Sequence, residues 1–274
     1  MALARLLGKR TYLDLDDAPS RTRSPVTIHN IESMMRMADG VFVGNRNLFK
    51  YAEKQQSAVY LIPSAINLQF YKPNEKANER GRITLGWIGH GAHYQEDLIQ
   101  ILLAPIEHLA SRYPLRLKIV GACASRELYR AFSAVPELEI DFIDEIDWSD
   151  ADRVSRAIKD FDIGLFPLLN NDFNRFKCGF KALEYMAIGI PVIASPIAIN
   201  SDIISDGRDG LLASSEAEWI EALSSLIEDS ELRSKMGETG RRKVETTFDV
   251  NRVASQVKAV LDRHHDACSP GTKT

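Results

Sequence analysis

The sequence of 274 residues has only three cysteines, and no two of them form a CxxC pair. Cys123, Cys178 and Cys268 are widely separated along the chain. This spacing indicates neither a disulfide framework nor a zinc site. A reducing cytoplasm is therefore the expected setting, because structural disulfides are rare there.

Long apolar runs and an excess of basic charge are also missing. No run reaches the roughly 18 apolar residues of a membrane span, and the opening stretch 1–10 is too short and too charged for a secretory signal. Peripheral attachment to the inner face of a membrane stays open. With 34 Lys and Arg against 38 Asp and Glu, the net charge is −4. This balance argues against a nucleic-acid partner, since such domains are usually basic.

What the sequence does contain is a repeated alternation of apolar, β-branched stretches with stretches of helical period. The first part predicts alternating strands and helices, in the order β-α-β-α-β, at 10–17, 26–38, 40–44, 47–54 and 58–62. The second part predicts strands at 82–88, 115–120, 138–143, 161–166, 191–195 and 210–213, with helices near 96–111, 125–134, 150–160, 180–188 and 215–228. This order predicts a doubly wound α/β fold that binds its ligand at the carboxyl ends of parallel strands.

Local signals suggest where the domains and helices begin and end. The polar segment 67–82 contains Pro73 and is typical of a linker. Ser149 with Asp152 and Ser215 with Glu218 have the spacing of capping boxes. Two further helices are expected at 230–246 and 249–265, the second capped by Asp249. We therefore predict a partial Rossmann-like domain at 1–75, a complete Rossmann-like domain at 76–248, a C-terminal helix at 249–266 and a disordered tail at 267–274.

The stretch from Phe176 to Ser195 predicts a loop, a helix and a buried strand, and it places Lys177, Lys181 and Glu184 around the helix start. Free N–H groups in the first turn of a helix attract anions, so two ammonium groups there favour a phosphate or diphosphate site. Glu184 is placed to accept hydrogen bonds from sugar hydroxyls. In the alternative interpretation the lysines are solvated surface charges, and Glu184 pairs with Lys181 at i,i+3.

Two other loops are candidate sites. The Gly89-His90-Gly91 loop would let the backbone approach a phosphate, although Tyr94 occupies the third glycine position of a dinucleotide fingerprint. An ordinary strand-to-helix turn is the alternative. Asp14-Leu-Asp16-Asp17 could hold a divalent metal or act as a phosphatase acid pair. A capped, solvated loop is the simpler account of these acids.

The stretch around the predicted helix start reads Lys177-Cys-Gly-Phe-Lys181-x-x-Glu184-Tyr-Met-Ala-x-Gly189-x-Pro191-Val. Mainly through this motif, the span from Ile83 to about Val260 resembles the nucleotide-sugar half of retaining GT-B glycosyltransferases of the group 1, or family 4, type. Supporting motifs in the same order are Gly86-Trp-Ile-Gly89, Leu117-Lys-Ile-Val-Gly121, Asp162-Ile-Gly-Leu-Phe-Pro167 and Ile204-x-Asp206-Gly-x-x-Gly210. Phe176 stands where the family commonly has a second Glu, and the stretch Gly89 to Gln95 lacks the usual cation.

The resemblance implies transfer of a sugar from a nucleoside diphosphate sugar to a hydroxyl of a carbohydrate or lipid-linked acceptor, in cell-surface polysaccharide or glycoconjugate synthesis. Lys181 and Lys177 would be catalytic, and no metal or cofactor is expected. The donor would contact Gly89, His90, Gly91, Ile143, Ile146, Gly179, Phe180 and Glu184, with the base near Ile143 to Ile146. It also implies a first domain that is truncated at its N-terminus. The alternative function is a non-catalytic nucleotide-sugar binding module that needs a partner chain.

Overall fold

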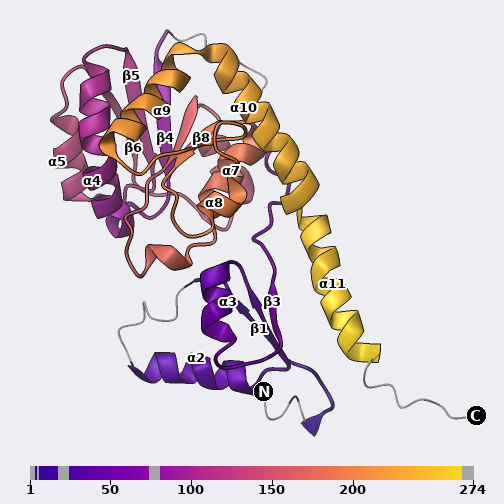
Figure 1. Cartoon of the computed structure of the whole chain (residues 1–274). Helices are drawn as coiled ribbons and strands as arrows, with labels where there is room; N and C mark the ends of the chain where they lie inside the picture. Colours follow the sequence, from indigo (N-terminus) through magenta and orange to yellow (C-terminus); the bar gives the residue numbers. More distant parts are fainter. Residues whose placement is uncertain (1–3, 5, 18–24, 74–80, 267–274) are drawn as a thin grey trace, which may run out of the picture.

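Two lobes, each built on its own parallel sheet, make up the structure (Figure 1). The computed structural model describes residues 4, 6–17, 25–73 and 81–266. We call the part built on residues 12–61 the small lobe and the part built on residues 83–248 the large lobe. The predicted tail at 267–274 and residues 74–80 of the predicted linker lie outside the described residues.

The large lobe contains a six-stranded sheet in the order β6-β5-β4-β7-β8-β9, and every pairing is parallel. Its strands are β4 (Ile83–Ile88), β5 (Leu115–Val120), β6 (Glu139–Ile143), β7 (Ile163–Phe166), β8 (Val192–Ala194) and β9 (Leu211–Leu212). The strand order reverses between β4 and β7, where a doubly wound sheet opens a crevice for its ligand. The predicted doubly wound fold is confirmed.

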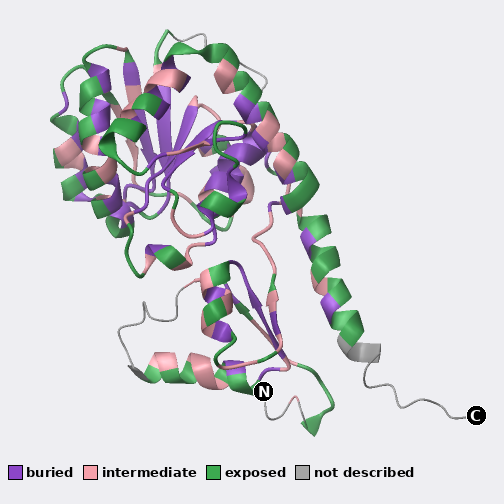
Figure 2. Ribbon diagram, viewed as in Figure 1, coloured by how far each residue is buried: buried purple, intermediate pink, exposed green. Residues whose placement is uncertain are grey.

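Helices lie on both sides of this sheet, and the strands between them are mostly buried (Figure 2). They are α4 (Gly91–Ala110), α5 (Arg126–Ser133), α6 (Ala151–Ile158), α7 (Phe180–Ile188), the short α8 (Asn200–Ile203), α9 (Glu216–Glu228) and α10 (Ser230–Lys243), with 3-10 turn η2 at Asn174–Phe176 and π turn η3 at Val244–Phe248. The central strands β4, β5, β7 and β8 are therefore covered on both faces, which explains their continuous apolar runs in the sequence. In the part of the chain that the structure describes, no helix is long and apolar enough to cross a membrane.

Two sequence predictions about helix starts were wrong. The helix expected at 96–111 begins at Gly91, because a side chain there would place its Cβ 2.6 Å from the Ala122 carbonyl oxygen, and glycine lets the helix start against that loop. Asp150, not Ser149, caps α6, since its carboxylate accepts from the N–H groups of Asp152 and Arg153. The capping box formed by Ser215 and Glu218 is confirmed.

The small lobe has three parallel strands in the order β1-β2-β3, namely β1 (Tyr12–Leu15), β2 (Gly40–Val43) and β3 (Val59–Leu61). Helices α2 (Pro25–Met37) and α3 (Arg46–Ala52) connect them. Met35 and Leu48 from these helices pack with Val41 and Val43 in its core. Cys178, which belongs to the loop before α7, is part of the same core. The two lobes therefore share buried apolar contacts.

The contact between the lobes depends on close packing and on side-chain hydrogen bonds. A Cβ at Gly44 would lie 2.3 Å from the Cys178 Sγ, so glycine is required at this position. The Asn45 amide nitrogen donates to the Phe176 carbonyl at 2.6 Å, while its oxygen accepts from Asn47 N and Leu48 N and caps α3. One buried side chain thus starts a helix in one lobe and holds a loop of the other.

The described chain passes between the lobes at residues 62–73 and again near Asp249. Ile66 N donates to the Phe248 carbonyl at 2.8 Å, and Val250 N donates to the Ile66 carbonyl at 3.0 Å. The last helix, α11 (Val250–Asp266), extends from this crossing past the small lobe (Figure 1). Asp249 caps it as predicted, accepting from Asn251 N.

Replacing Asn45 by Asp tests the hydrogen bond between the lobes. Asp keeps the oxygen that caps α3 but loses the donor to Phe176 and places a charge at a site that is 2% exposed. We expect the free energy of unfolding in urea to fall by at least about 1–3 kcal/mol. Asn47→Asp, at an exposed hydrogen bond to Arg175, is the matched control and should cost less. An Asn45→Asp variant as stable as the wild type would contradict this role.

Candidate active site

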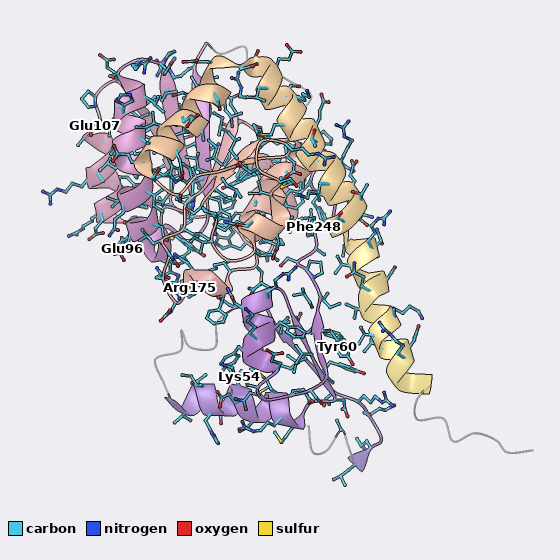
Figure 3. The ribbon with its side chains drawn as sticks, in the orientation of Figure 1. Lys54, Tyr60, Glu96, Glu107, Arg175 and Phe248 are labelled. Atoms are coloured by element: carbon cyan, nitrogen blue, oxygen red, sulfur yellow. The ribbon has the colours of Figure 1, made fainter. Side chains whose placement is uncertain are left out.

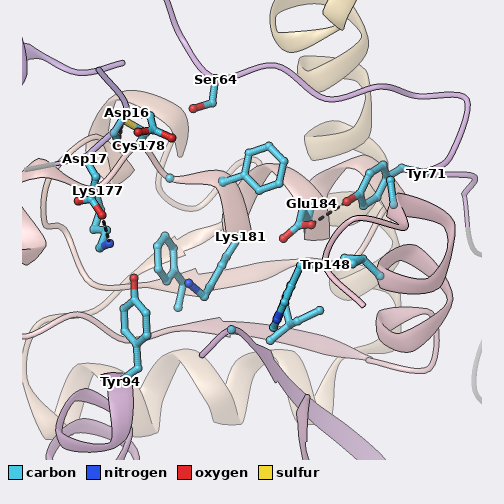
Figure 4. Close-up of a pocket in the computed structure, with 17 residues that line it drawn as sticks. Asp16, Asp17, Ser64, Tyr71, Tyr94, Trp148, Lys177, Cys178, Lys181 and Glu184 are labelled. Carbon is cyan, nitrogen blue, oxygen red and sulfur yellow. Dashed lines mark hydrogen bonds and ion pairs between the residues drawn. The ribbon is translucent and has the colours of Figure 1, made fainter. Parts of the chain in front are cut away.

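A pocket of about 410 Å³ lies at the carboxyl ends of β4 and β7, where the two lobes meet (Figure 4). The small lobe and the first crossing contribute Asp16, Asp17, Ser64 and Tyr71. The large lobe contributes Ile88, Gly89, Tyr94, Trp148, Ala151, Val154, Phe166, Lys177, Cys178, Gly179, Phe180, Lys181 and Glu184. The pocket is therefore built from residues that are distant in the sequence.

The start of α7 forms one wall of this pocket. Gly179 is the N-cap residue and has a φ of 71°, a left-handed conformation that favours glycine. It provides no side chain to accept from the N–H groups of the first turn. Because Gly179, Phe180 and Lys181 line the pocket, the positive end of the helix dipole lies at its wall, which suits an anion.

Lys181 is a partly desolvated cation in the first turn of α7. Its Nζ lies 4.2 Å from the centroid of the Tyr94 ring and 5.3 Å from that of Phe166. Burial, and next the charge of Lys177, lower the pKa of Lys181 from 10.5 to about 8. Among the described residues, no carboxylate forms an ion pair with it. An anionic ligand would restore the interactions that this ammonium group lacks.

Lys177 connects the two walls of the pocket. Its Nζ forms an ion pair with Asp17, just beyond the end of β1, at 3.1 Å and lies 3.9 Å from the centroid of the Phe173 ring. The Cys178 thiol donates to the Asp16 carbonyl at 3.0 Å. The acidic loop after β1 is thus held against the residues that precede α7.

Glu184 lies one turn into α7 and is 6% exposed. Burial raises the pKa of Glu184 to about 7, although a hydrogen bond from Tyr71 and the charge of Lys181 oppose this rise. The Tyr71 hydroxyl donates to Glu184 Oε1 at 2.7 Å. In the alternative interpretation Glu184 pairs with Lys181. The described residues show no such ion pair, and the hydrogen-bond partner of Glu184 is Tyr71.

The structure brings most of the predicted site residues together. Gly89, Lys177, Gly179, Phe180, Lys181 and Glu184 all line the pocket. His90 and Gly91 lie at the start of α4, and the exposed ring of His90 stacks on His93 at 4.0 Å. Ile143 and Ile146 pack against the core of the large lobe. These last four residues do not line the pocket, and contact with a donor stays a prediction for all ten.

Sequence reasoning missed Ser64 and Tyr71, and it placed the base near Ile143 to Ile146 without assigning a role to Trp148 at the end of that loop. It read Asp16 and Asp17 as a capped, solvated loop, with a metal or phosphatase site as the alternatives. Trp148 is 51% exposed, a large aromatic side chain left at the pocket surface. Its position just after the polar loop that follows β6 was an available signal, because a solvated Trp is unusual. Tyr71 carried no such signal, since its partner Glu184 is 113 residues away.

Two Rossmann-like units that meet at a pocket on the carboxyl ends of their strands define an α/β protein of the GT-B class. A model of the family described as glycosyl transferases group 1 matches residues 82–229. That match spans more than half of the chain, and the protein belongs to this family.

Relatives in sequence carry a consistent name. The chain is 26% identical to D-inositol 3-phosphate glycosyltransferase of Corynebacterium glutamicum, covering 93% of the chain and 63% of the relative. It is 27% identical to the protein of the same name in Corynebacterium kroppenstedtii, covering 97% of the chain and 61% of the relative. The chain thus spans about three fifths of the length of these relatives.

Solved structures share the fold at low sequence identity. Sucrose-phosphate synthase of Thermosynechococcus elongatus gives a TM-score of 0.72 at 18% identity, covering 98% of this chain and 71% of that one. HepE of Anabaena, in complex with UDP and glucose, gives 0.73 at 15% identity, covering 94% of this chain and 73% of that one. These similarities confirm the predicted GT-B-like architecture.

The raised pKa of Glu184 predicts how stability depends on pH. The folded chain keeps a proton on this carboxyl up to about pH 7, whereas the unfolded chain loses it near 4.5. The contribution of Glu184 to the free energy of unfolding therefore falls as pH rises from 4.5 to 7, by on the order of 3 kcal/mol.

Urea denaturation across this pH range tests the effect. Glu184→Gln removes the ionisation, so its free energy of unfolding should fall less steeply with pH than that of the wild type. Glu107→Gln, on the exposed face of α4 (Figure 3), is the control and should follow the wild type. Parallel curves for wild type and Glu184→Gln would contradict the prediction.

Proposed function

We propose that the pocket binds a nucleoside diphosphate sugar and that the protein transfers its sugar, with retention of configuration, to an acceptor hydroxyl. The observation that carries this proposal is the gathering of Lys177 and Lys181 at the positive end of α7. Cations are usually favoured at the opposite end of a helix. Membership of the group 1 glycosyltransferase family supports the proposal, as does the binding of UDP and glucose by HepE.

The diphosphate takes the position in front of the first turn of α7. Glycosyl transfer passes through an oxocarbenium-like state, in which the departing diphosphate gains negative charge. Lys177, Lys181 and the N–H groups after Gly179 stabilise that charge, as donors arranged before the reaction do at an oxyanion hole. In this scheme the protein's own groups provide the counter-charge, without a metal ion.

The remaining walls of the pocket suit the other parts of the two substrates. Glu184 accepts hydrogen bonds from the ribose, and the base lies against Trp148, beyond the loop that contains Ile143 and Ile146. Asp16 of the small lobe and Ser64 of the first crossing line the pocket and provide polar contacts for a carbohydrate or lipid-linked acceptor. We place the reaction on the cytoplasmic side, in the synthesis of surface polysaccharide or glycoconjugate.

Thermal shifts with UDP, GDP, ADP and their glucose conjugates test the binding step. A ligand present at 100 times its Kd adds about 2.7 kcal/mol of stability to the folded state. We expect at least one of these nucleotides to raise the melting temperature, and no shift with any of them would contradict the proposal. Sugar transfer is assayed separately, and binding without transfer would indicate a non-catalytic nucleotide-sugar binding module.

Lys181→Ala should weaken binding of the nucleotide by about 1.5–3 kcal/mol, because a charge-assisted contact to the diphosphate is lost. Burial of the charged Lys181 side chain lowers the stability of the folded state, so the variant without ligand should stay folded. Isothermal titration calorimetry measures the Kd. Lys235→Ala, on the exposed face of α10, is the matched control. Equal affinity in the wild type and in Lys181→Ala would rule out this position for the diphosphate.

The fluorescence of Trp148 can report where the nucleotide base binds. Trp87 and Trp219 are 0% and 1% exposed, whereas Trp148 is 51% exposed and lines the pocket. We expect the nucleotide to change the fluorescence of the wild type and Trp219→Phe, but not that of Trp148→Phe. Replacing Trp148 by Ala should weaken binding by about 1–3 kcal/mol, the usual contribution of stacking on one base. A full fluorescence change in Trp148→Phe would place the base elsewhere.

A further inference from the structure

Tyr71, in the crossing between β3 and β4, has a role that depends on the proposed function. We propose that Tyr71 is a positioning residue that orients Glu184 toward the ribose hydroxyls of the donor. The segment that joins the lobes thus helps to select ribonucleotides. Tyr71 lies outside the large lobe's strands and helices, yet its side chain is 4% exposed and belongs to that lobe's core.

One carboxyl oxygen of Glu184 is hydrogen-bonded to the protein, and the other faces the pocket. Oε1 accepts the Tyr71 hydroxyl at 2.7 Å. Figure 4 shows the other oxygen pointing away from Tyr71 into the pocket, on the side of Lys181. Because one oxygen is held, the free one has a fixed direction in which to accept a hydroxyl proton. Tyr71 itself lines the pocket, so its phenolic oxygen can accept from a second, vicinal hydroxyl.

An arginine of α10 links Tyr71 to α7, the helix that carries Glu184. Arg241 of α10 donates from one guanidinium nitrogen to the Tyr71 carbonyl at 2.6 Å, and the same nitrogen donates to the Ala187 carbonyl in α7. Arg241 is paired in turn with Glu245 at 2.6 Å. The main chain at Tyr71 is thereby linked to α7, and the buried side chain places its hydroxyl 2.7 Å from Glu184 Oε1.

The neighbouring phenol does not replace Tyr71 in this role. The Tyr185 hydroxyl accepts from Ile88 N at 3.1 Å and donates to the Leu165 carbonyl at 3.3 Å, so it is committed to β4 and β7. The groups that act on the charge of Glu184 are Tyr71 from the crossing and Lys181 from its own helix. Removing the Tyr71 hydroxyl leaves a buried carboxyl whose orientation no other described hydrogen bond fixes.

The test compares ribonucleotides with analogues that lack both ribose hydroxyls. The probes are UDP, GDP and ADP, each with its 2′,3′-dideoxy form, and calorimetry on the full chain gives each Kd. For a nucleotide that binds, the wild type should prefer the ribo form by about tenfold or more, the worth of a charge-assisted hydrogen bond. In Tyr71→Phe, which keeps the buried ring, that preference should fall to about threefold or less.

The ratio of the two Kd values separates positioning from a purely structural role. A structural role would weaken ribo and dideoxy forms equally and leave their ratio unchanged, and this result would overturn the inference. Tyr51→Phe is the matched control, because it removes another phenol-to-carboxylate hydrogen bond, to Glu32 at 3.1 Å, far from the pocket. It should leave the ratio at the wild-type value.

A pH series gives an independent measurement. Burial raises the pKa of Glu184 to about 7, and the Tyr71 hydrogen bond lowers it. The wild-type ratio should therefore increase as pH rises through about 7, when the carboxyl ionises, and the midpoint in Tyr71→Phe should move to higher pH. Taking the ratio removes the effect of Lys181 on the diphosphate, which both forms share. An unmoved midpoint would contradict the role of Tyr71.

The two proposals fail in different ways. If none of the three ribonucleotides binds the wild type, the proposed function is wrong, and this inference falls with it. If one binds and Tyr71→Phe keeps the full ribose preference, only the role of Tyr71 is wrong.

Discussion

Two ammonium groups at the positive end of α7 are the electrostatic constraint on which the site depends. Asp17 of the small lobe neutralises part of this positive charge, because it forms an ion pair with Lys177 at 3.1 Å. Lys181 has no carboxylate in an ion pair with it among the described residues and lies against aromatic rings. Its burial, and next the repulsion from Lys177, lower the pKa of Lys181 to about 8. The site in its unliganded form therefore holds charge that a diphosphate would neutralise.

This electrostatic arrangement requires that the two lobes be held together. Cys178 fills the core of the small lobe, and Asn45 binds the loop that it belongs to. Asp17 and Lys177 come from the two sides of the same contact, so packing and charge act at one place. The group 1 glycosyltransferase family match covers 82–229 only, yet the pocket is completed by residues outside that span.

The parts of this structure that sequence predicts are those with local causes. Helix α7 was predicted at 180–188 and found there, because Gly179 and Gly189 both adopt left-handed conformations at its ends and apolar residues fill its interior. The gathering of Lys177, Lys181 and Glu184 around the start of this helix follows from the same local pattern. The first turn of α4 was missed, because its start depends on contact between Gly91 and Ala122, which no local pattern shows. Tyr71 and Asp17 were missed as partners for a similar reason, since Asp17 is 160 residues from Lys177.

The hydrogen bonds of Ile66 with Phe248 and Val250 join the two chain segments that connect the lobes. The outgoing and returning chains are hydrogen-bonded to each other where they pass between the lobes, so the two connections are joined at one point. Tyr71 follows this point by five positions and is fixed to the large lobe. A rotation of the small lobe about this point would therefore have to break the ion pair between Asp17 and Lys177, whereas the hydrogen bond between Tyr71 and Glu184 would stay intact.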